Sequence, residues 1–165
     1  MKPFVVLLCA LLLALAGCHT SQPEKVTRDL ARLHARAEHG GAGAQYELGR
    51  AYAEAWNAQE ASVWYRKAGE QGLSDAQYAL GQNYFTGEGV PRNNIEAYAW
   101  FSLAAAQENR LAINARNKII RQMTRAELEE GNRRAFDLVT QHPRAKGVAK
   151  PTEPAPPPAG SRKAR

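Results

Sequence analysis

Apolar residues recur at helical spacing through the middle of the chain. Two matching sets lie four residues apart: Ala44, Leu48 and Tyr52, then Ala76, Leu80 and Tyr84. Two further sets mix spacings of three and four residues: Ala61, Trp64, Tyr65 and Ala68, then Ala97, Trp100, Phe101 and Ala104. Residues at these spacings share one face of an α-helix. The pattern therefore predicts four helices, each with an apolar side.

These four helices form two copies of one unit. The segment 44–52 recurs at 76–84, a shift of 32 residues, and the segment 61–68 recurs at 97–104, a shift of 36 residues. The four additional residues fall between the two helices of the second copy. We therefore expect the connection between helices to be shorter in copy one. A unit of this length with two helices is typical of stacked helix-pair repeats.

Polar residues and glycines mark where these helices should start and stop. Four pairs have the spacing of a capping arrangement: Asn57 with Glu60, Ser74 with Gln77, Asn93 with Glu96, and Thr124 with Glu127. Gly40 and Gly72 are expected to end helices in the left-handed conformation. Gly87, Gly89 and Pro91 predict a turn between the two helices of copy two.

Apolar stripes extend the helical region on both sides of the repeats. One stripe predicts a helix over residues 26–39: Val26, Leu30, Leu33 and Ala37. Another predicts a helix after the repeats: Ala112, Ala115, Ile119 and Ile120. A last helix should stop before Pro143 and contains Leu128, Ala135, Phe136 and Leu138. We therefore expect an all-α domain over residues 26–140, with flanking helices that cover the ends of the stack.

The repeated motifs carry a family resemblance. They are Leu-Gly-x-x-Tyr at 48–52 and 80–84, Gly-x-Gly-Val at 87–90, and Ala-x-x-Trp-Phe/Tyr-x-x-Ala at 61–68 and 97–104. Together they resemble the Sel-one-like repeat (SLR), a relative of the tetratricopeptide repeat, over residues 37–108. Copy one departs from the pattern, with Glu54-Ala55-Trp56 in place of Gly-x-Gly-Val. The resemblance implies an antiparallel helix-pair solenoid, a right-handed superhelical stack of about two full repeats with flanking capping helices.

The resemblance also implies a binding surface. In stacked helix pairs the first helix of each pair lines the concave face, where ligands usually lie. Aligned on Leu48 and Leu80, the candidate partner-binding positions are Tyr46, Arg50 and Glu54, then Tyr78, Gln82 and Phe85. The alternative interpretation is that Tyr46 and Tyr78 are partly buried scaffold residues. Four further aromatic residues are expected in the core rather than in a ligand site: Trp64, Tyr65, Trp100 and Phe101.

The first 17 residues have the pattern of a secretory signal. Lys2 precedes an apolar run over residues 4–16, which is too short to span a bilayer as a helix. The following Leu15-Ala16-Gly17-Cys18 resembles the lipobox of bacterial lipoproteins, which implies removal of residues 1–17 and acylation of Cys18. Residues 18–25 would form a lipid-anchored tether, and His19 points to the outer membrane, facing the periplasm. The alternative is an ordinary signal with a chance cysteine.

Charge is concentrated at the end of the chain. Residues 19–140 contain 15 Lys or Arg and 15 Asp or Glu, whereas residues 141–165 contain six basic residues against Glu153 alone. A neutral body argues against nucleic acid as a partner. The proline-rich tail over 141–165 is expected to stay disordered. Its positive charge would allow weak contact with an anionic envelope polymer, or the tail is a solvated appendage without a ligand.

No pattern in the sequence indicates catalysis or a metal site. His34 and His39 are five residues apart, which is not the spacing for sharing a metal on one helix face, and Glu88 is a lone carboxylate in a turn. We therefore expect a non-enzymatic protein without cofactor or metal. The leading hypothesis is an envelope lipoprotein that acts as a protein–protein interaction scaffold or adaptor for a protein or peptide partner. The alternatives are a structural tether between outer membrane and cell-wall polymer, and a regulatory subunit of a periplasmic enzyme.

Overall fold

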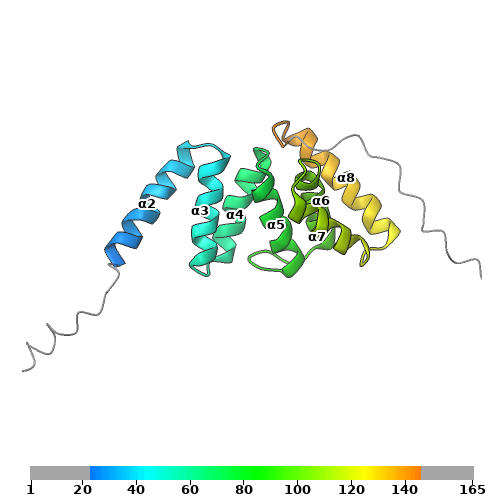
Figure 1. Cartoon of the computed structure of the whole chain (residues 1–165), viewed down its shortest axis with the longest axis horizontal. Coiled ribbons are helices and arrows are strands. Elements are labelled where there is room, and N and C mark those ends of the chain that lie inside the picture. The colour runs from blue at the N-terminus through cyan, green and yellow to red at the C-terminus, as the bar shows by residue number, and fades with distance from the viewer. Residues whose placement is uncertain (1–22, 146–165) are drawn as a thin grey trace, which may run out of the picture.

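The computed structural model describes residues 23–145. Within this range the chain forms seven α-helices and no strand: α2 (Pro23–His39), α3 (Ala42–Glu54), α4 (Ala58–Glu70), α5 (Ser74–Thr86), α6 (Asn94–Ala105), α7 (Arg110–Ile120) and α8 (Arg125–Gln141). The helices run up and down in turn along the long axis of the molecule (Figure 1). The predicted all-α helix-pair solenoid is confirmed. Within the described residues, no helix is long and apolar enough to cross a membrane.

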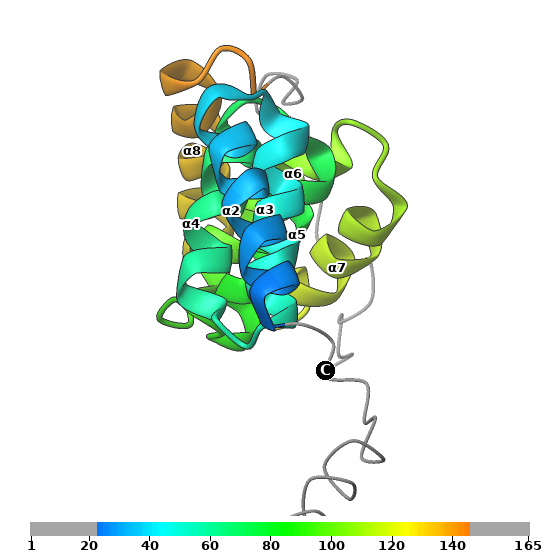
Figure 2. The same ribbon diagram turned by 90° about the vertical axis from the view of Figure 1, so that its left-hand side faces the viewer.

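Each helix from α2 to α6 packs against the next one, and α8 packs against α6. Seen along the stack, α4 and α8 lie on one side of the molecule and α7 on the other (Figure 2). The connection between α3 and α4 spans residues 55–57, and the one between α5 and α6 spans residues 87–93. The predicted shorter connection in copy one is therefore confirmed.

The core is built from the aromatic and aliphatic residues that repeat in the sequence. Leu48, Leu80 and Trp100 are fully buried, and three further aromatic residues are almost so: Trp64, Tyr65 and Phe101. Their predicted place in the core is confirmed. Glycines let the paired helices approach closely, since a Cβ atom on Gly81 would lie 2.6 Å from Cδ1 of Phe101. Burial of large aromatic side chains supplies most of the hydrophobic stabilisation in such a stack.

The junctions between units use a repeated pair of glutamines. Gln77 is fully buried and its side-chain amide donates to the carbonyl of Gly69 at 2.9 Å, while its own oxygen accepts from Gln107 at 2.8 Å. The same arrangement one unit earlier joins Gln71 to Gln45 at 2.6 Å, and Gln45 donates to the carbonyl of Ala37 at 3.3 Å. We call each of these a glutamine junction. Each junction gives hydrogen-bond partners to buried amide groups, which would otherwise lower the stability of the folded state.

Most of the predicted helix starts are confirmed. The side chain of Asn57 accepts from the backbone of Glu60 at 3.3 Å, and Asn93 accepts from the backbone of two residues at the start of α6. Thr124 and Glu127 form a complete capping box. The predicted capping role of Ser74 is wrong: Leu73 is the N-cap of α5 and has no side-chain cap. Gln77, the expected partner of Ser74, points into the glutamine junction instead.

The two predicted helix-ending glycines behave differently. Gly72 has a φ of +95°, so its predicted left-handed conformation is confirmed. Gly40 does not have a positive φ, and the prediction for it is wrong. Gly40 is required for close approach instead, because a Cβ atom there would lie 2.1 Å from the carbonyl oxygen of Arg36.

The repeat domain extends beyond its predicted end at residue 140. Helix α8 runs to Gln141, and residues 142–145, which we call the strap, pack back against Gly72 in the connection between α4 and α5. Ala145 is only 1% exposed, and its amide donates to the carbonyl of His142 at 2.8 Å. The prediction of a disordered tail from residue 141 is thus wrong for its first five residues. The signal, Cys18, the tether up to residue 22 and the tail from 146 lie outside the described residues.

Candidate partner-binding groove

A groove runs between α5 and α7, with α6 as its floor. Its volume is about 430 Å³, and its lining residues are Tyr78, Gln82, Phe85, Thr86, Phe101, Leu111, Asn114, Ala115 and Lys118. Three of the six candidate residues therefore line one cavity, namely those from copy two. The wall from α5 carries the candidate residues of copy two, and the wall from α7 carries none of the six.

The inside of the groove is apolar. The ring of Tyr78 packs against Phe101 with centroids 5.9 Å apart, and Phe101 is buried beneath it. On the opposite wall Leu111 is 60% exposed, so its side chain is accessible to a ligand. Solvent-exposed apolar surface of this kind, surrounded by polar groups, is typical of ligand and peptide sites.

The mouth of the groove carries positive charge. Two cations lie near the ring of Phe85: the Nζ atom of Lys118 is 5.6 Å from the ring centroid, and the Cζ atom of Arg92 is 5.8 Å from it. Neither cation forms an ion pair with another described residue, and none of the lining residues is acidic. An anionic group placed beside Phe85 would meet both cations.

This arrangement suits a short extended peptide segment. The apolar slot over Phe101 accommodates one aliphatic or aromatic side chain. The amides of Gln82 on α5 and Asn114 on α7 both line the groove and can pair with peptide backbone groups. A carboxylate on the same segment would lie near Lys118. Such a combination of a buried anchor and a few polar contacts is the usual anatomy of a protein interface.

The candidate residues of copy one lie outside this groove. Arg50 donates to Glu54 at 3.4 Å on the exposed surface of α3, and Tyr46 packs against Tyr65 with centroids 5.6 Å apart. Burial, and then the charge of Asp75, raise the pKa of Tyr46. Burial also raises the pKa of Tyr65 to about 12, with Tyr46 as the next cause. The hydroxyl groups of both tyrosines therefore stay protonated at neutral pH. The side chain of Tyr46 is half-buried, so it both packs in the fold and is partly accessible at the surface.

Sequence reasoning missed the wall of the groove that α7 supplies. A signal was present, because the second unit spans 36 residues, from 74 to 109. Asn114 and Lys118 follow Tyr78 and Gln82 by the same 36 residues, so they occupy the corresponding positions of α7. Treating α7 as a flanking helix, rather than as the first helix of an incomplete third unit, hid this correspondence.

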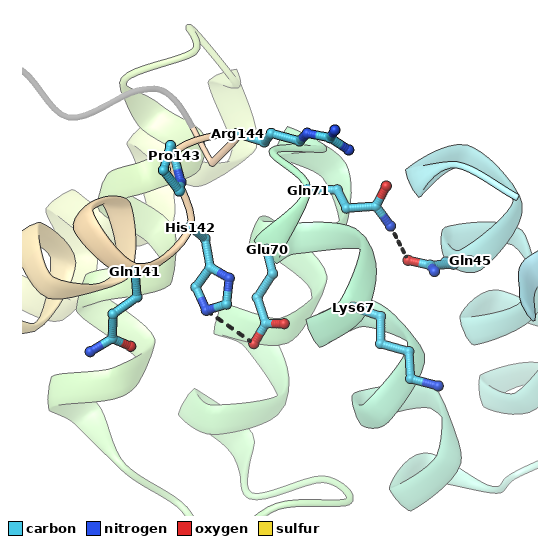
Figure 3. Close-up of a pocket in the computed structure, with 8 residues that line it drawn as sticks. All are labelled: Gln45, Lys67, Glu70, Gln71, Gln141, His142, Pro143 and Arg144. Atoms are coloured by element: carbon cyan, nitrogen blue, oxygen red, sulfur yellow. Dashed lines mark hydrogen bonds and ion pairs between the residues drawn. The ribbon is translucent and has the colours of Figure 1, made fainter.

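A second, polar pocket lies at the end of the stack where α4 stops (Figure 3). Its volume is about 410 Å³, and its walls come from α3, α4, the end of α8 and the strap: Gln45, Lys67, Glu70, Gln71, Gln141, His142, Pro143 and Arg144. His142 Nε2 lies 3.8 Å from Glu70 Oε1. The strap that completes this pocket was expected to be disordered, so the pocket was not predicted from the sequence. Its lining is hydrophilic and shows no apolar anchor position.

His34 and Glu88, which were considered for metal binding and catalysis, each make ordinary structural contacts. His34 Nδ1 lies 3.3 Å from Glu38 Oε1, and the His34 ring packs edge-on against Trp64. Glu88 lies exposed in the loop between α5 and α6, where its backbone carbonyl accepts from Ser62 at 3.4 Å. Among residues 23–145 no group of three His, Cys, Asp or Glu side chains is placed to hold a metal ion.

Two comparisons identify the family. Residues 42–73 and 74–109 each match the Sel1 repeat. The crystal structure of a Sel1 repeat protein from Oxalobacter formigenes is 30% identical, with a TM-score of 0.51, and the match covers 67% of this chain and 90% of that one. The chain belongs to the Sel1 repeat family. Its matched units coincide with α3–α4 and α5–α6, so each unit is one helix pair.

Parts of two longer proteins are also similar to this chain. A protective antigen of uropathogenic Escherichia coli with an SLR fold is 29% identical, with a TM-score of 0.66 over 75% of this chain. The chitin synthase regulator SKT5 of Saccharomyces cerevisiae is 39% identical over 71 residues, or 43% of this chain. The chain spans 30% of the E. coli protein and 10% of the yeast protein. Sel1 repeats generally mediate protein–protein interactions and typically form non-catalytic scaffolds.

Proposed function

We propose that this Sel1 repeat protein is a bacterial envelope lipoprotein that binds a short, acidic segment of a partner protein in the groove between α5 and α7. The observation that carries the proposal is the position of Phe85, which lines the apolar groove and has the cations of both Lys118 and Arg92 near its ring. A scaffold needs an accessible apolar anchor site and a means of selecting its partner. The slot supplies the first and the two cations supply the second.

The proposed location rests on the N-terminal sequence. Residues 15–18 resemble a lipobox, so acylation of Cys18 would anchor the domain, in the outer membrane and facing the periplasm. Several acyl chains on one residue give stable anchoring, because each buried methylene contributes about 0.8 kcal/mol. The partner would then be another periplasmic or membrane-associated protein.

Photo-crosslinking from the groove tests the proposed partner site. A benzophenone amino acid replaces Leu111, which is exposed on the rim, in cells that express the full chain. We expect a single crosslinked partner, attached through a segment that contains Asp or Glu. The matched position is Phe136 on α8, which is 48% exposed and does not line the groove. Equal labelling from both positions would contradict a specific groove.

The acidic character of the partner is tested with the crosslinked segment made as a synthetic peptide. Lys118→Gln should weaken its binding by roughly 1–3 kcal/mol, about 5- to 150-fold, because a charge-assisted contact is lost. Arg133→Gln removes the same charge from the exposed surface of α8 and should leave the affinity unchanged. An affinity that is insensitive to Lys118 and to salt would exclude an acidic ligand.

One observation favours a second candidate function. The yeast relative is, by its name, a regulator of an enzyme. By analogy, the partner of this chain would be a periplasmic enzyme whose activity changes when its segment occupies the groove. The crosslinking experiment separates the two candidates, because a captured enzyme can be assayed with wild-type protein and with Lys118→Gln. Unchanged activity despite binding would favour the scaffold without regulation.

A further inference from the structure

Trp56 is the most exposed large apolar side chain in the described part of the molecule. It lies in the connection between α3 and α4 and is 94% exposed. A tryptophan carries the largest apolar surface of any residue, and leaving it in water forgoes the stabilisation that burial would give. The fold therefore gains nothing from this side chain at this position.

The backbone at Trp56 is as unusual as its exposure. Its φ is +59°, in the left-handed region that favours glycine. The Trp56 amide donates to the carbonyl of Ala53, and the Asn57 amide donates to that of Tyr52, which together form a Schellman motif with Trp56 at the left-handed position. The same motif after α4 has Gly72 at this position. Helix α5, the counterpart of α3 in copy two, has Gly87 at its C-cap with a φ of +86°. Copy one thus has tryptophan in the left-handed conformation where copy two has glycine.

Trp56 lies at the same end of the stack as the start of α2. Because the helices alternate in direction, the first residues of α2 and the connections after α3 and α5 share one end, at the bottom of Figures 1 and 2. The strap and the polar pocket lie at the opposite end. Four residues separate Cys18 from Pro23, the first residue of α2. Even fully extended, this segment spans only about 17 Å.

We propose that Trp56 inserts into the headgroup region of the phospholipid bilayer to which Cys18 tethers the chain. The inference rests on the lipid anchoring proposed above. A tether this short holds the Trp56 end of the stack against the bilayer surface. Tryptophan is enriched at this depth of membranes, because its ring is apolar while its N–H can still reach polar groups. The helices then stand along the membrane normal, with the strap pointing away from the bilayer.

One indole suffices for this contact because the tether makes the insertion intramolecular. Free in solution, a single aromatic side chain would bind membranes only weakly and reversibly, and stable association needs a second signal. Acyl chains on Cys18 supply that signal and raise the effective concentration of lipid around Trp56. The neighbouring loop residues have mixed charge, with Glu88 and Arg92 both exposed, so the contact is apolar rather than electrostatic.

Fluorescence quenching by brominated lipids tests the contact. The lipidated full chain is reconstituted into vesicles of phosphatidylethanolamine and phosphatidylglycerol with bromine on the acyl chains near the headgroups. Trp64 and Trp100 are buried, so only Trp56 is accessible to the quencher. We expect a loss of emission that is absent in Trp56→Gly. This variant keeps the Schellman motif and therefore the fold, which circular dichroism verifies.

A displaced tryptophan provides the matched control. Phe136→Trp in the Trp56→Gly background restores an exposed indole about 16 Å along α8 from its first residue, and should not be quenched. The inference is overturned if lipidated wild type shows no quenching, or if tryptophans at positions 56 and 136 are quenched equally. Neither result contradicts the proposed lipid anchor at Cys18. A protein crosslink from Trp56 in place of lipid quenching overturns it as well. Mass analysis that finds Cys18 without acyl chains refutes the anchor itself, and the inference with it.

Discussion

The ring of Tyr65 lies directly against the backbone of Gly49. A Cβ atom on Gly49 would lie 2.6 Å from Cδ1 and 2.7 Å from Cε1 of that ring, and 3.3 Å from the carbonyl oxygen of Ala61. Gly81 and Phe101 repeat the relationship in copy two. The glycine in the Leu-Gly-x-x-Tyr motif is thus the point at which the two helices of each pair touch. It sets the distance between them.

Gly49→Ala should therefore destabilise the protein despite the better helix propensity of alanine. The added methyl group forces the ring of Tyr65 or helix α4 to move, and such overpacking costs about 1–3 kcal/mol. Urea unfolding followed by circular dichroism measures the effect. Gly43→Ala on the same helix is the control, because a Cβ atom there has nothing within 4 Å. That variant should gain up to about 1 kcal/mol, and equal losses at both positions would contradict the account.

Trp56→Gly should raise the free energy of unfolding. The left-handed conformation costs an L-residue roughly 1–2 kcal/mol, and part of this gain is offset by the larger unfolded-state entropy of glycine. We expect a net increase of about 0.5–1 kcal/mol in chemical denaturation. Trp56→Ala removes the same ring but keeps the strained φ, so its stability should stay close to wild type. A gain in both variants would assign the effect to the ring rather than to the backbone.

Gly72→Ala should release the strap. Its φ of +95° disfavours any side chain, and a Cβ atom would lie 2.1 Å from the carbonyl oxygen of Arg144. We expect faster hydrogen exchange at the amide of Ala145, which donates to His142 in the native strap. In a chain that ends after Gln141, and so lacks the strap, the same substitution should lower the free energy of unfolding by less. Only the penalty of about 1–2 kcal/mol for the left-handed backbone then remains. Equal costs in the two backgrounds would show that the strap does not depend on Gly72.

The capping box of α8 predicts a dependence of stability on pH. The backbone amide and then the hydroxyl of Thr124 donate to Glu127, and these hydrogen bonds lower the pKa of that carboxylate. Because the pKa is lower in the folded state, this contribution is present above the unfolded value of 4.5 and is lost as the pH falls through the folded pKa. Urea unfolding below pH 4.5 should therefore show a smaller loss of stability in Glu127→Gln than in wild type.

Substitutions of Thr124 separate the capping box from other acid effects. Thr124→Ser keeps a hydroxyl group and should retain the wild-type dependence on pH. Thr124→Ala removes the side-chain donor and should weaken the dependence, along with the cap itself. An unchanged profile in both Thr124→Ala and Glu127→Gln would show that other carboxylates control the acid limb.

The helix pairs could be predicted from the sequence because they depend on periodicity. Features that depend on close tertiary contacts could not be predicted. Leu48, Leu80 and the paired aromatic residues identified the helix pairs, because their spacing follows directly from helix geometry. Ser74 and Gly40 were misjudged because their local patterns fit caps, whereas the buried Gln77 and the carbonyl of Arg36 decide their surroundings. Tertiary contacts of this kind override local preference and leave no periodic signal.

The candidate groove was predictable on one wall only. Tyr78, Gln82 and Phe85 follow from the inner-face positions of the repeat, but Leu111 and Lys118 belong to a helix without a complete repeat motif. The strap was not predicted for a different reason. It belongs to a proline-rich segment with small side chains, whose composition predicts disorder. Ala145 is nevertheless buried, because Gly72 leaves room for the backbone of residue 144.

The glutamine junctions have a consequence for how such arrays change over evolution. In both junctions one glutamine donates to a backbone carbonyl of the preceding helix and accepts a hydrogen bond from a second glutamine. A tandem duplication of residues 74–109 would therefore meet matching groups on either side, with no new side chain needed at the joints. The array can grow or shrink by whole modules, while the sequences that flank it remain as they are.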